Sequence, residues 1–116
     1  MNKIVPDALS ASWLASRLGE EPARIDAMRR GGELIAFLPE GAWERYFPVW
    51  QFDDEWRPLP NVPRIVDAAR RAGLSENRLY QVLNSRLGLA DRRKLADLLR
   101  DGREEHVLEA VRSARR

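Results

Sequence analysis

Side chains that can read DNA bases are concentrated between residues 75 and 86. On a helix, the exposed face of this segment carries Ser75, Asn77, Arg78 and Gln81. Asn and Gln side chains pair bidentately with adenine, Arg pairs with guanine, and Ser hydroxyl groups bond to phosphate oxygens. These residue types predict base recognition in a major groove, with Arg71 placed upstream to contact the DNA backbone.

The same segment belongs to a helix-turn-helix pattern. This motif needs small residues in its first helix, a glycine in its turn and apolar residues that hold the two helices together. The matching positions are Ala68, Ala69, Ala72, Gly73, Leu74, Leu79 and Val82. We predict a first helix from Pro63 to Ala72 and a second that Ser75 caps and that ends near Leu87. Because such helix pairs also occur as plain packing units, a structural module that binds no DNA remains an alternative.

A second copy of the pattern lies nearer the N-terminus. Its positions are Leu14, Ala15, Leu18, Gly19, Ile25 and Met28. We predict a first helix that Ser10 or Ser12 caps and that ends at Leu18. Trp13 is expected to face the core of this copy. The second helix is expected over residues 22–30, because proline suits a first helical turn and glycines follow at its end.

The exposed face of residues 21–30 carries both signs of charge. Arg24, Arg29 and Arg30 are candidate DNA-binding residues, but Glu21 and Asp26 accompany them. Because carboxylates repel phosphate groups, the composition favours residues 75–86 as the reading helix.

Residues 33–52 predict a β-hairpin or wing. The run ELIAF at 33–37 is typical of a short strand, and PEG at 39–41 is typical of a turn. The run VWQF at 49–52 is expected to form the returning strand.

The stretch SASWLASRLGEEPARIDAMRRGGELIAF, followed by the PEG turn, resembles the winged helix-turn-helix of excisionase and MerR-type DNA-binding domains. This resemblance implies that Arg24, Arg29 and Arg30 line the recognition helix. It also implies that residues 38–42 form the tip of the wing.

The C-terminal half predicts further short helices. Asp91 is placed to cap a helix that ends at Arg100 or Asp101, and a last helix follows in REEHVLEAVRSARR with three apolar residues on one face. These apolar residues are Val107, Leu108 and Val111.

The stretch LNSRLGLADRRKLADLLRDGREEHVLEAV resembles the toxin-binding domain of the MbcA/ParS/Xre type of antitoxin. The residues that match are Leu98, Leu99, Gly102 and Val107. This resemblance implies an alternative function, in which the chain neutralises a protein toxin and binds DNA only to autoregulate its own operon.

Aromatic residues crowd between the two halves. They include Trp43, Tyr46, Trp50, Phe52 and Trp56. A base-stacking platform needs basic residues between its aromatic rings, whereas the residues interleaved here are mostly apolar or acidic. A ligand pocket would need convergent polar groups, which this stretch lacks. We therefore predict a structural joint between two small modules.

Composition and charge argue against an enzyme, a metal site and a membrane protein, and they indicate which half of the chain suits a polyanion. The chain has 116 residues and no cysteine, and its single histidine, His106, has no nucleophile beside it. We expect no enzymatic activity, no metal site and no cofactor. No apolar run has the length of a signal peptide or a membrane span, so we expect a cytoplasmic protein without a membrane partner. Residues 1–57 carry 7 basic and 10 acidic side chains, whereas residues 58–116 carry 13 and 8. The second half is the better electrostatic footprint for a polyanion.

Taken together, the sequence predicts a mainly α-helical protein. A helix-turn-helix with a small β-hairpin wing is followed by a C-terminal bundle of about four short helices. The two modules, residues 1–57 and 58–116, are expected to form one compact unit. We expect a sequence-specific transcriptional regulator that binds double-stranded DNA as a homodimer, because a single small module makes few specific contacts.

Overall fold

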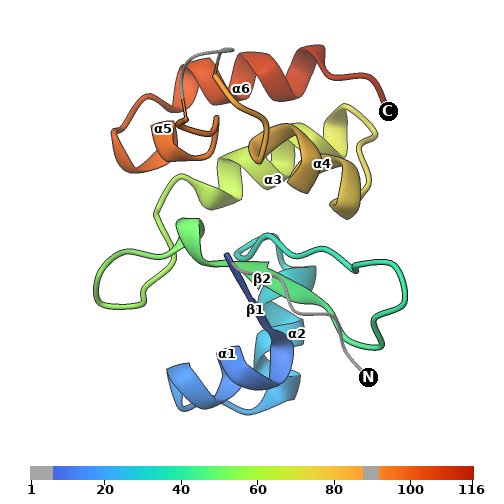
Figure 1. The fold of residues 1–116 in the computed structure, drawn as a ribbon, viewed down its shortest axis with the longest axis vertical. Helices are drawn as coiled ribbons and strands as arrows, with labels where there is room; N and C mark the ends of the chain where they lie inside the picture. Colours follow the sequence, from blue (N-terminus) through green and yellow to red (C-terminus); the bar gives the residue numbers. More distant parts are fainter. Residues whose placement is uncertain (1–6, 88–91) are drawn as a thin grey trace.

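The computed structural model describes residues 7–87 and 92–116. This part of the chain is mainly helical and has one small antiparallel sheet, which confirms the predicted fold class (Figure 1). In chain order the elements are β1 (Ala8–Ser10), α1 (Ala11–Leu18), α2 (Pro22–Arg30), β2 (Tyr46–Pro48), the 3-10 helix η1 (Val49–Gln51), α3 (Val62–Arg71), α4 (Glu76–Leu83), α5 (Asp97–Arg100) and α6 (Glu104–Ser113). No helix in these two ranges is both long and apolar enough to span a membrane.

The first helix pair, α1 and α2, forms over the predicted residues. The Ser10 hydroxyl caps α1 by accepting a hydrogen bond from the Trp13 backbone N–H at 3.3 Å, and Gly19 ends the helix with φ at 67°. The prediction that Trp13 faces inward is wrong, since its side chain is 69% exposed. Successive helical residues are about 100° apart, so burial of Leu14 and Ala15 turns Trp13 towards solvent.

The strands of the small sheet are not the two strands predicted for the hairpin, residues 33–37 and 49–52. β1 and β2 are antiparallel, with Leu9 opposite Phe47. Between residues 33–37 and the returning chain only a single bridge forms, from Phe37 to Tyr46, and residues 49–51 form η1 instead of a strand.

The side chain of Gln51 explains why residues 33–37 and 49–52 do not pair as strands. It accepts a hydrogen bond from the Ile35 N–H at 2.7 Å and donates to the Ile35 carbonyl at 2.7 Å. These are the groups that a strand partner would have used. Pro48 also lacks the N–H that would continue a ladder.

The described part of the C-terminal half, residues 58–87 and 92–116, contains four helices, α3 to α6, but two are shorter than predicted. α4 ends at Leu83 and not near Leu87, and α5 begins only at Asp97. The reason is that the chain beyond α4 pairs with the segment before α5: the N–H of Leu95 donates to the Ser85 carbonyl at 2.8 Å, and the N–H of Ala96 donates to the Leu83 carbonyl at 2.9 Å. The proposed cap Asp91 lies outside the described residues.

The helices form two groups around the sheet. In Figure 1, α1 lies below β1 and β2, α3 to α6 lie above them, and α2 runs behind the strands, where its C-terminal end bonds to Arg70 of α3. Each group, or layer, has its own buried cluster: Leu14 and Ile25 belong to the lower one, and Ile65 and Leu108 to the upper one. In α6 the predicted inward residues Val107, Leu108 and Val111 are almost completely buried.

The aromatic stretch contributes to the buried clusters of both layers. Trp50 packs in the upper cluster, and Phe52 packs in the lower one. Tyr46 lies with Phe37 in a third small cluster, and the Phe37 ring stacks on Tyr80 of α4 with ring centroids 3.7 Å apart. The aromatic stretch therefore supplies buried side chains to three separate clusters.

Two of the aromatic residues predicted for the joint lie differently. Trp43 is 71% exposed in the loop before β2 and is not part of a buried joint, because the chain turns outward there. Trp56 is partly buried, its backbone has φ at 63°, and the guanidinium group of Arg17 lies 4.9 Å from its ring centroid. This conformation is uncommon for a bulky residue.

Candidate nucleic-acid interface

The predicted reading residues of α4 are engaged within the protein. The Ser75 hydroxyl caps α4 by accepting from the Arg78 N–H at 3.1 Å. The Asn77 carboxamide accepts from the Leu38 N–H at 2.8 Å and donates to the Leu38 carbonyl at 2.9 Å. The Arg78 guanidinium donates to the Arg115 carbonyl at 2.6 Å and to Gln81 at 3.2 Å. These contacts occupy polar groups of all four predicted reading residues, although Ser75, Asn77 and Gln81 are exposed to solvent.

Further residues of α4 connect it to the N-terminal half. The Glu76 carboxylate pairs with Arg29 of α2 and with Arg45 before β2, each at 3.2 Å. Tyr80 stacks on Phe37, and burial raises the pKa of its phenol. Of the eight residues of α4, only Asn77 and Gln81 are exposed. The helix is thus packed between the N-terminal half and the end of the chain.

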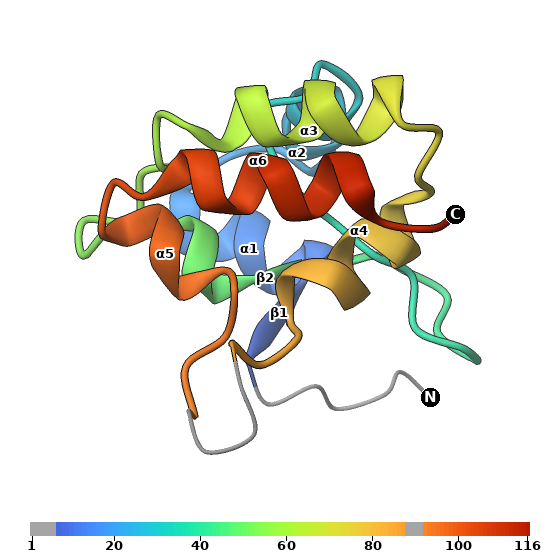
Figure 2. The same cartoon turned by 90° about the horizontal axis from the view of Figure 1, so that it is seen from above.

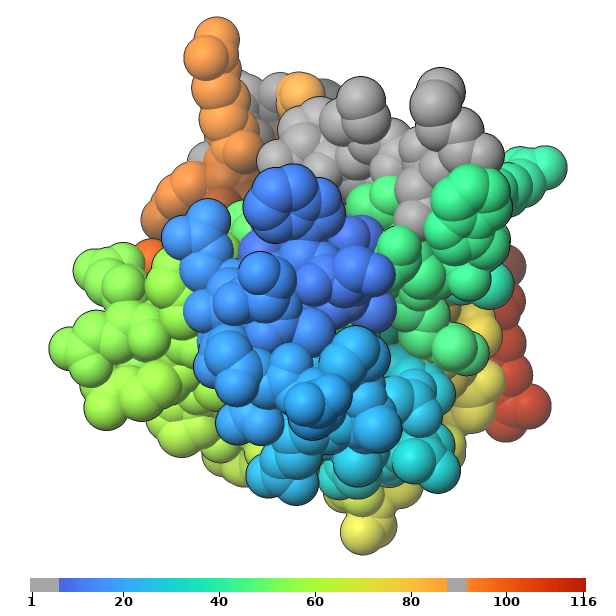
Figure 3. Space-filling model, turned by 90° about the horizontal axis from the view of Figure 1, so that it is seen from below, coloured from blue at the N-terminus to red at the C-terminus, as the bar shows by residue number. Residues whose placement is uncertain are grey.

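The second helix of the other pair, α2, presents an open face. Its only fully buried residue is Ile25. The exposed residues are Pro22, Ala23, Arg24, Ala27 and Arg30. The guanidinium group of Arg24 makes no hydrogen bond or ion pair with any residue in the described ranges. Figure 3 shows this side of the molecule, where α1 and α2 occupy the centre of the view.

Arginines of α2 neutralise the acidic residue on the same helix. Asp26 pairs with Arg29 and with Arg30, each at 2.9 Å. The hydrogen bond from Arg29 lowers the pKa of the Asp26 carboxyl, so this group stays ionised and paired. Asp26 was expected to repel phosphate, and these two pairs reduce that repulsion.

Arg29 itself is placed differently from Arg24 and Arg30. Its side chain is only 15% exposed. Burial opposes its charged form, but the hydrogen bond to Asp26 and the charge of Glu76 outweigh this effect and raise its pKa. Arg29 was predicted to line a recognition helix, and the structure instead gives it an internal ion pair that links α2 to α4.

Residues 38–45 form the loop at the predicted wing, and it projects from the body of the molecule (Figure 1). The Ala42 N–H closes a turn on the Pro39 carbonyl at 3.0 Å. The Glu44 carboxylate accepts from the backbone N–H and the hydroxyl group of Ser12, both at 2.9 Å. The loop is therefore fastened to α1 by Glu44 and to α4 by the Asn77 contacts.

Several arginines gather where α2, α3 and the end of the chain meet. Arg70 donates to the carbonyl groups of Arg29 and Arg30 at 3.4 and 3.0 Å, which satisfies the C-terminal end of α2. Arg71, a predicted backbone contact, is exposed and pairs with Asp67 at 2.9 Å. The Arg116 guanidinium donates to the Ala72 carbonyl at 3.2 Å.

Sequence reasoning missed the residues that join the two halves. Glu76 has the sequence signature of an acidic residue in a first helical turn, and nothing in the sequence marks it as the partner of Arg29 and Arg45. Gln51 likewise gave no signal beyond its place between aromatic residues. Within residues 7–87 and 92–116, no cluster of three or more His, Asp or Glu side chains is placed to hold a metal ion.

Comparisons with known proteins give one informative likeness. No protein-family model matches the chain. No curated protein matches it either. An NMR structure of Rv2175c matches with a TM-score of 0.76 and 16% sequence identity, over 97% of this chain and 85% of that chain. At this identity the likeness shows a shared fold and nothing further.

Proposed function

We propose that the protein is a DNA-binding regulator whose reading helix is α2 and whose wing is the loop 38–45. The observation that carries the proposal is the difference between the two candidate helices. α2 has an exposed face with an unpaired arginine, Arg24, whereas the polar residues of α4 bond to the loop and to the end of the chain.

The chemistry of the α2 face suits entry into a major groove. Ala23 and Ala27 are small, so the helix backbone can approach base edges closely, and alanine methyl groups can contact thymine methyl groups. Arg24 extends from the same face and can bond to guanine or to a phosphate group. Arg30 lies six residues further along α2, less than two turns away, where its charge can contact the DNA backbone.

The loop 38–45 is the second contact in this proposal. Leu38 and Trp43 are 40% and 71% exposed, and the loop is fastened at both sides of its base. A fixed projecting loop can enter a groove beside the reading helix with little loss of conformational entropy. We further propose a homodimer, because one helix and one loop read few base pairs and two-fold pairing doubles the footprint.

The proposal is tested by selecting binding sites from a pool of random duplex DNA and then measuring affinity across a salt series. We expect an enriched sequence, and a logarithm of the binding constant that falls linearly with the logarithm of the salt concentration. Absence of binding to any duplex at low ionic strength would overturn the proposal.

A further inference from the structure

The loop 38–45 carries an exposed tryptophan near its tip. The Trp43 side chain is 71% exposed, and the two residues before it, Gly41 and Ala42, are the smallest residue types. Figure 2 shows the loop projecting from the helices, and Figure 3 shows it at the edge of the face that α1 and α2 occupy. The indole is thus a bulky apolar group on a slender projection, on the same face as the proposed reading helix.

Both ends of this loop are fixed to the body of the protein. Phe37, just before the loop, and Tyr46, just after it, exchange two backbone hydrogen bonds at 2.9 and 2.8 Å. The Glu44 carboxylate, next to Trp43, accepts two hydrogen bonds from Ser12 of α1. A side chain can separate stacked bases only if the backbone that carries it does not yield, and these bonds give Trp43 a firm support.

The Glu76 carboxylate ties the loop to α2. It pairs with Arg29 of α2 and with Arg45 at the end of the loop, each at 3.2 Å. The proposed reading helix and the loop therefore bond to the same acidic group, and a duplex positioned by α2 meets the loop at a fixed separation.

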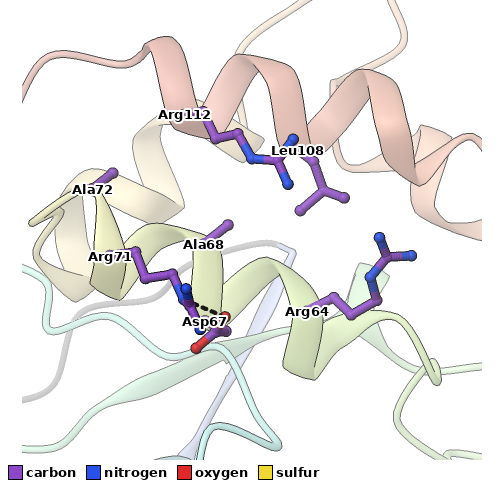
Figure 4. A pocket seen from close by; sticks show the side chains of 7 residues that line it. All are labelled: Arg64, Asp67, Ala68, Arg71, Ala72, Leu108 and Arg112. Carbon is purple, nitrogen blue, oxygen red and sulfur yellow. Dashed lines mark hydrogen bonds and ion pairs between the residues drawn. The ribbon is translucent and has the colours of Figure 1, made fainter.

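The loop lacks the positive charge that phosphate binding needs. Residues 38–44 include no lysine or arginine, and they include the exposed Glu40. Arginines line other surfaces, such as the hollow between α3 and α6 that Arg64, Arg71 and Arg112 border (Figure 4). A loop that held DNA by its phosphate groups would carry such cations. Contact between this loop and DNA therefore depends on its apolar side chains.

We propose that Trp43 is a wedge that enters between two stacked base pairs and bends the duplex. The inference rests on the proposed function, because it needs DNA that α2 has positioned. Apolar side chains inserted in this way unstack a base step, kink the duplex and let it follow more of the protein surface. A pyrimidine followed by a purine unstacks most easily, so the loop selects such a step without a hydrogen bond to either base.

A duplex with a preformed defect tests the wedge. A single mismatched pair is placed at each position in turn of the duplex that the wild-type protein selects. Because a mismatched pair is already poorly stacked, the wild-type protein should bind about tenfold more tightly when the mismatch lies at the step that Trp43 enters. Fluorescence energy transfer between dyes on the two ends should show that the protein bends the intact duplex. If no mismatch tightens binding, or if the duplex stays straight, the proposal is wrong.

Variants of Trp43 identify the group that enters the duplex. Trp43→Ala should weaken binding to the intact duplex about tenfold, because the stacking of an aromatic ring on a base is lost. It should also abolish the gain at the mismatch and reduce the bend. Trp43→Phe keeps an aromatic ring and should restore the bend and most of the affinity. A Trp43→Ala protein that still bends the duplex and still prefers the mismatch would overturn the proposal.

Trp13→Ala is the matched control, because the Trp13 side chain is 69% exposed but lies on α1. This variant should keep both the bend and the preference for the mismatch. Equal loss of both properties in Trp13→Ala and Trp43→Ala would contradict a specific wedge. Sedimentation of the free proteins tests a second copy as the occupant instead. If Trp43→Ala abolished self-association and left the bend unchanged, the loop would be a contact between copies and the wedge would be excluded.

The results separate this inference from the proposed function. If Arg24→Ala weakens specific binding while Trp43→Ala leaves affinity and bend as in the wild-type protein, the wedge is wrong and α2 remains the reading helix. If the wild-type protein binds no duplex even at low ionic strength, the proposed function is wrong and the wedge is wrong with it.

Discussion

The two helix-turn-helix pairs of this protein share a sequence pattern but differ in what surrounds their second helices. Both pairs have a glycine turn with positive φ, at Gly19 and Gly73. In the first pair, α2 buries only Ile25 and leaves its other side to solvent. In the second pair, α4 is covered by the loop 38–45, by α2 and by the end of the chain. The pattern specifies how two helices pack, and it does not specify which helix remains free to bind.

The contacts of α4 show why its composition resembles a reading helix. Asn77 uses one donor and one acceptor on the peptide groups of Leu38, the same bidentate chemistry with which asparagine pairs with adenine. Arg78 donates to a carbonyl oxygen as it would donate to guanine. Polar side chains suited to nucleic acid are equally suited to backbone groups, so only the fold distinguishes the two uses.

The largest effect is expected at the joint between the two pairs. Gln51 is completely buried, and it bonds to the N–H and carbonyl groups of Ile35 and to the Pro48 carbonyl. Gln51→Ala leaves these buried groups without partners, and we expect the free energy of unfolding to fall by about 3 kcal/mol. Urea denaturation measures this change. Gln81→Ala, on the exposed side of α4, is the control and should cost less than about 0.5 kcal/mol. A loss at Gln51 as small as that of the control would show that the joint does not hold the layers together.

The next largest effect is expected at the hydrogen bonds between Asn77 of α4 and Leu38 of the loop 38–45. Asn77→Ala removes both bonds to Leu38, and we expect about 1 kcal/mol of destabilisation and faster exchange of the Leu38 amide hydrogen. Hydrogen exchange followed by NMR measures the local effect. If Asn77 were free to read bases, its replacement would leave the Leu38 amide unchanged and would affect only DNA affinity.

A smaller effect is expected for the ion pairs between the two helix pairs. Glu76→Gln weakens the pairs with Arg29 and Arg45, and we expect a loss of about 0.5 kcal/mol because Glu76 and Arg45 are both 40% exposed and screened by solvent. Glu109→Gln on the exposed side of α6 is the matched control. The difference between the two variants should shrink at high salt, and a difference that persists would indicate a packing effect in place of an ionic one.

The smallest effect is a pH dependence within α2. Because the pKa of Asp26 is lowered in the folded protein, its contribution to stability is present above its ordinary pKa of 3.8 and is lost as the pH falls below that value. Asp26→Asn should therefore lower the unfolding temperature slightly at neutral pH, and the two proteins should converge in acid. Thermal unfolding followed by circular dichroism measures both. A constant difference across this range would show that the pairing with Arg29 and Arg30 is unimportant.

Local sequence signals predicted where helices begin and end better than they predicted which segments pack or pair together. Caps and breakers such as Ser10, Gly19 and Ser75 placed the ends of α1 and the start of α4, because these effects act within one turn of the chain. The two strands predicted at residues 33–37 and 49–52 do not pair, because Gln51, a residue with no strand or turn signature, bonds to the backbone groups of Ile35. α5 begins late because Leu95 and Ala96 bond to the chain beyond α4.

The candidate site was predictable only in outline. Two helix-turn-helix patterns and a projecting loop could be read from local residues, and they are present. The choice between α2 and α4 as the reading helix could not be predicted from local residues. It depends on contacts between residues far apart in the sequence, such as Arg29 with Glu76 and Asn77 with Leu38. The base-pairing side chains of residues 75–86 and the carboxylates of residues 21–30 pointed to residues 75–86 as the reading helix. The alternative of an antitoxin with a toxin partner stays a prediction.

The most direct test of the central claim compares Arg24→Ala with Arg78→Ala in binding to the selected duplex. If α2 is the reading helix, Arg24→Ala weakens specific binding by about 1–3 kcal/mol when Arg24 contacts a base, or lowers the salt slope by about one when it contacts a phosphate group. Arg78→Ala should leave affinity within about twofold, because Arg78 bonds to Gln81 and to the Arg115 carbonyl inside the protein. The reverse ranking, with Arg78→Ala the more damaging variant, would contradict the account and return the reading function to α4.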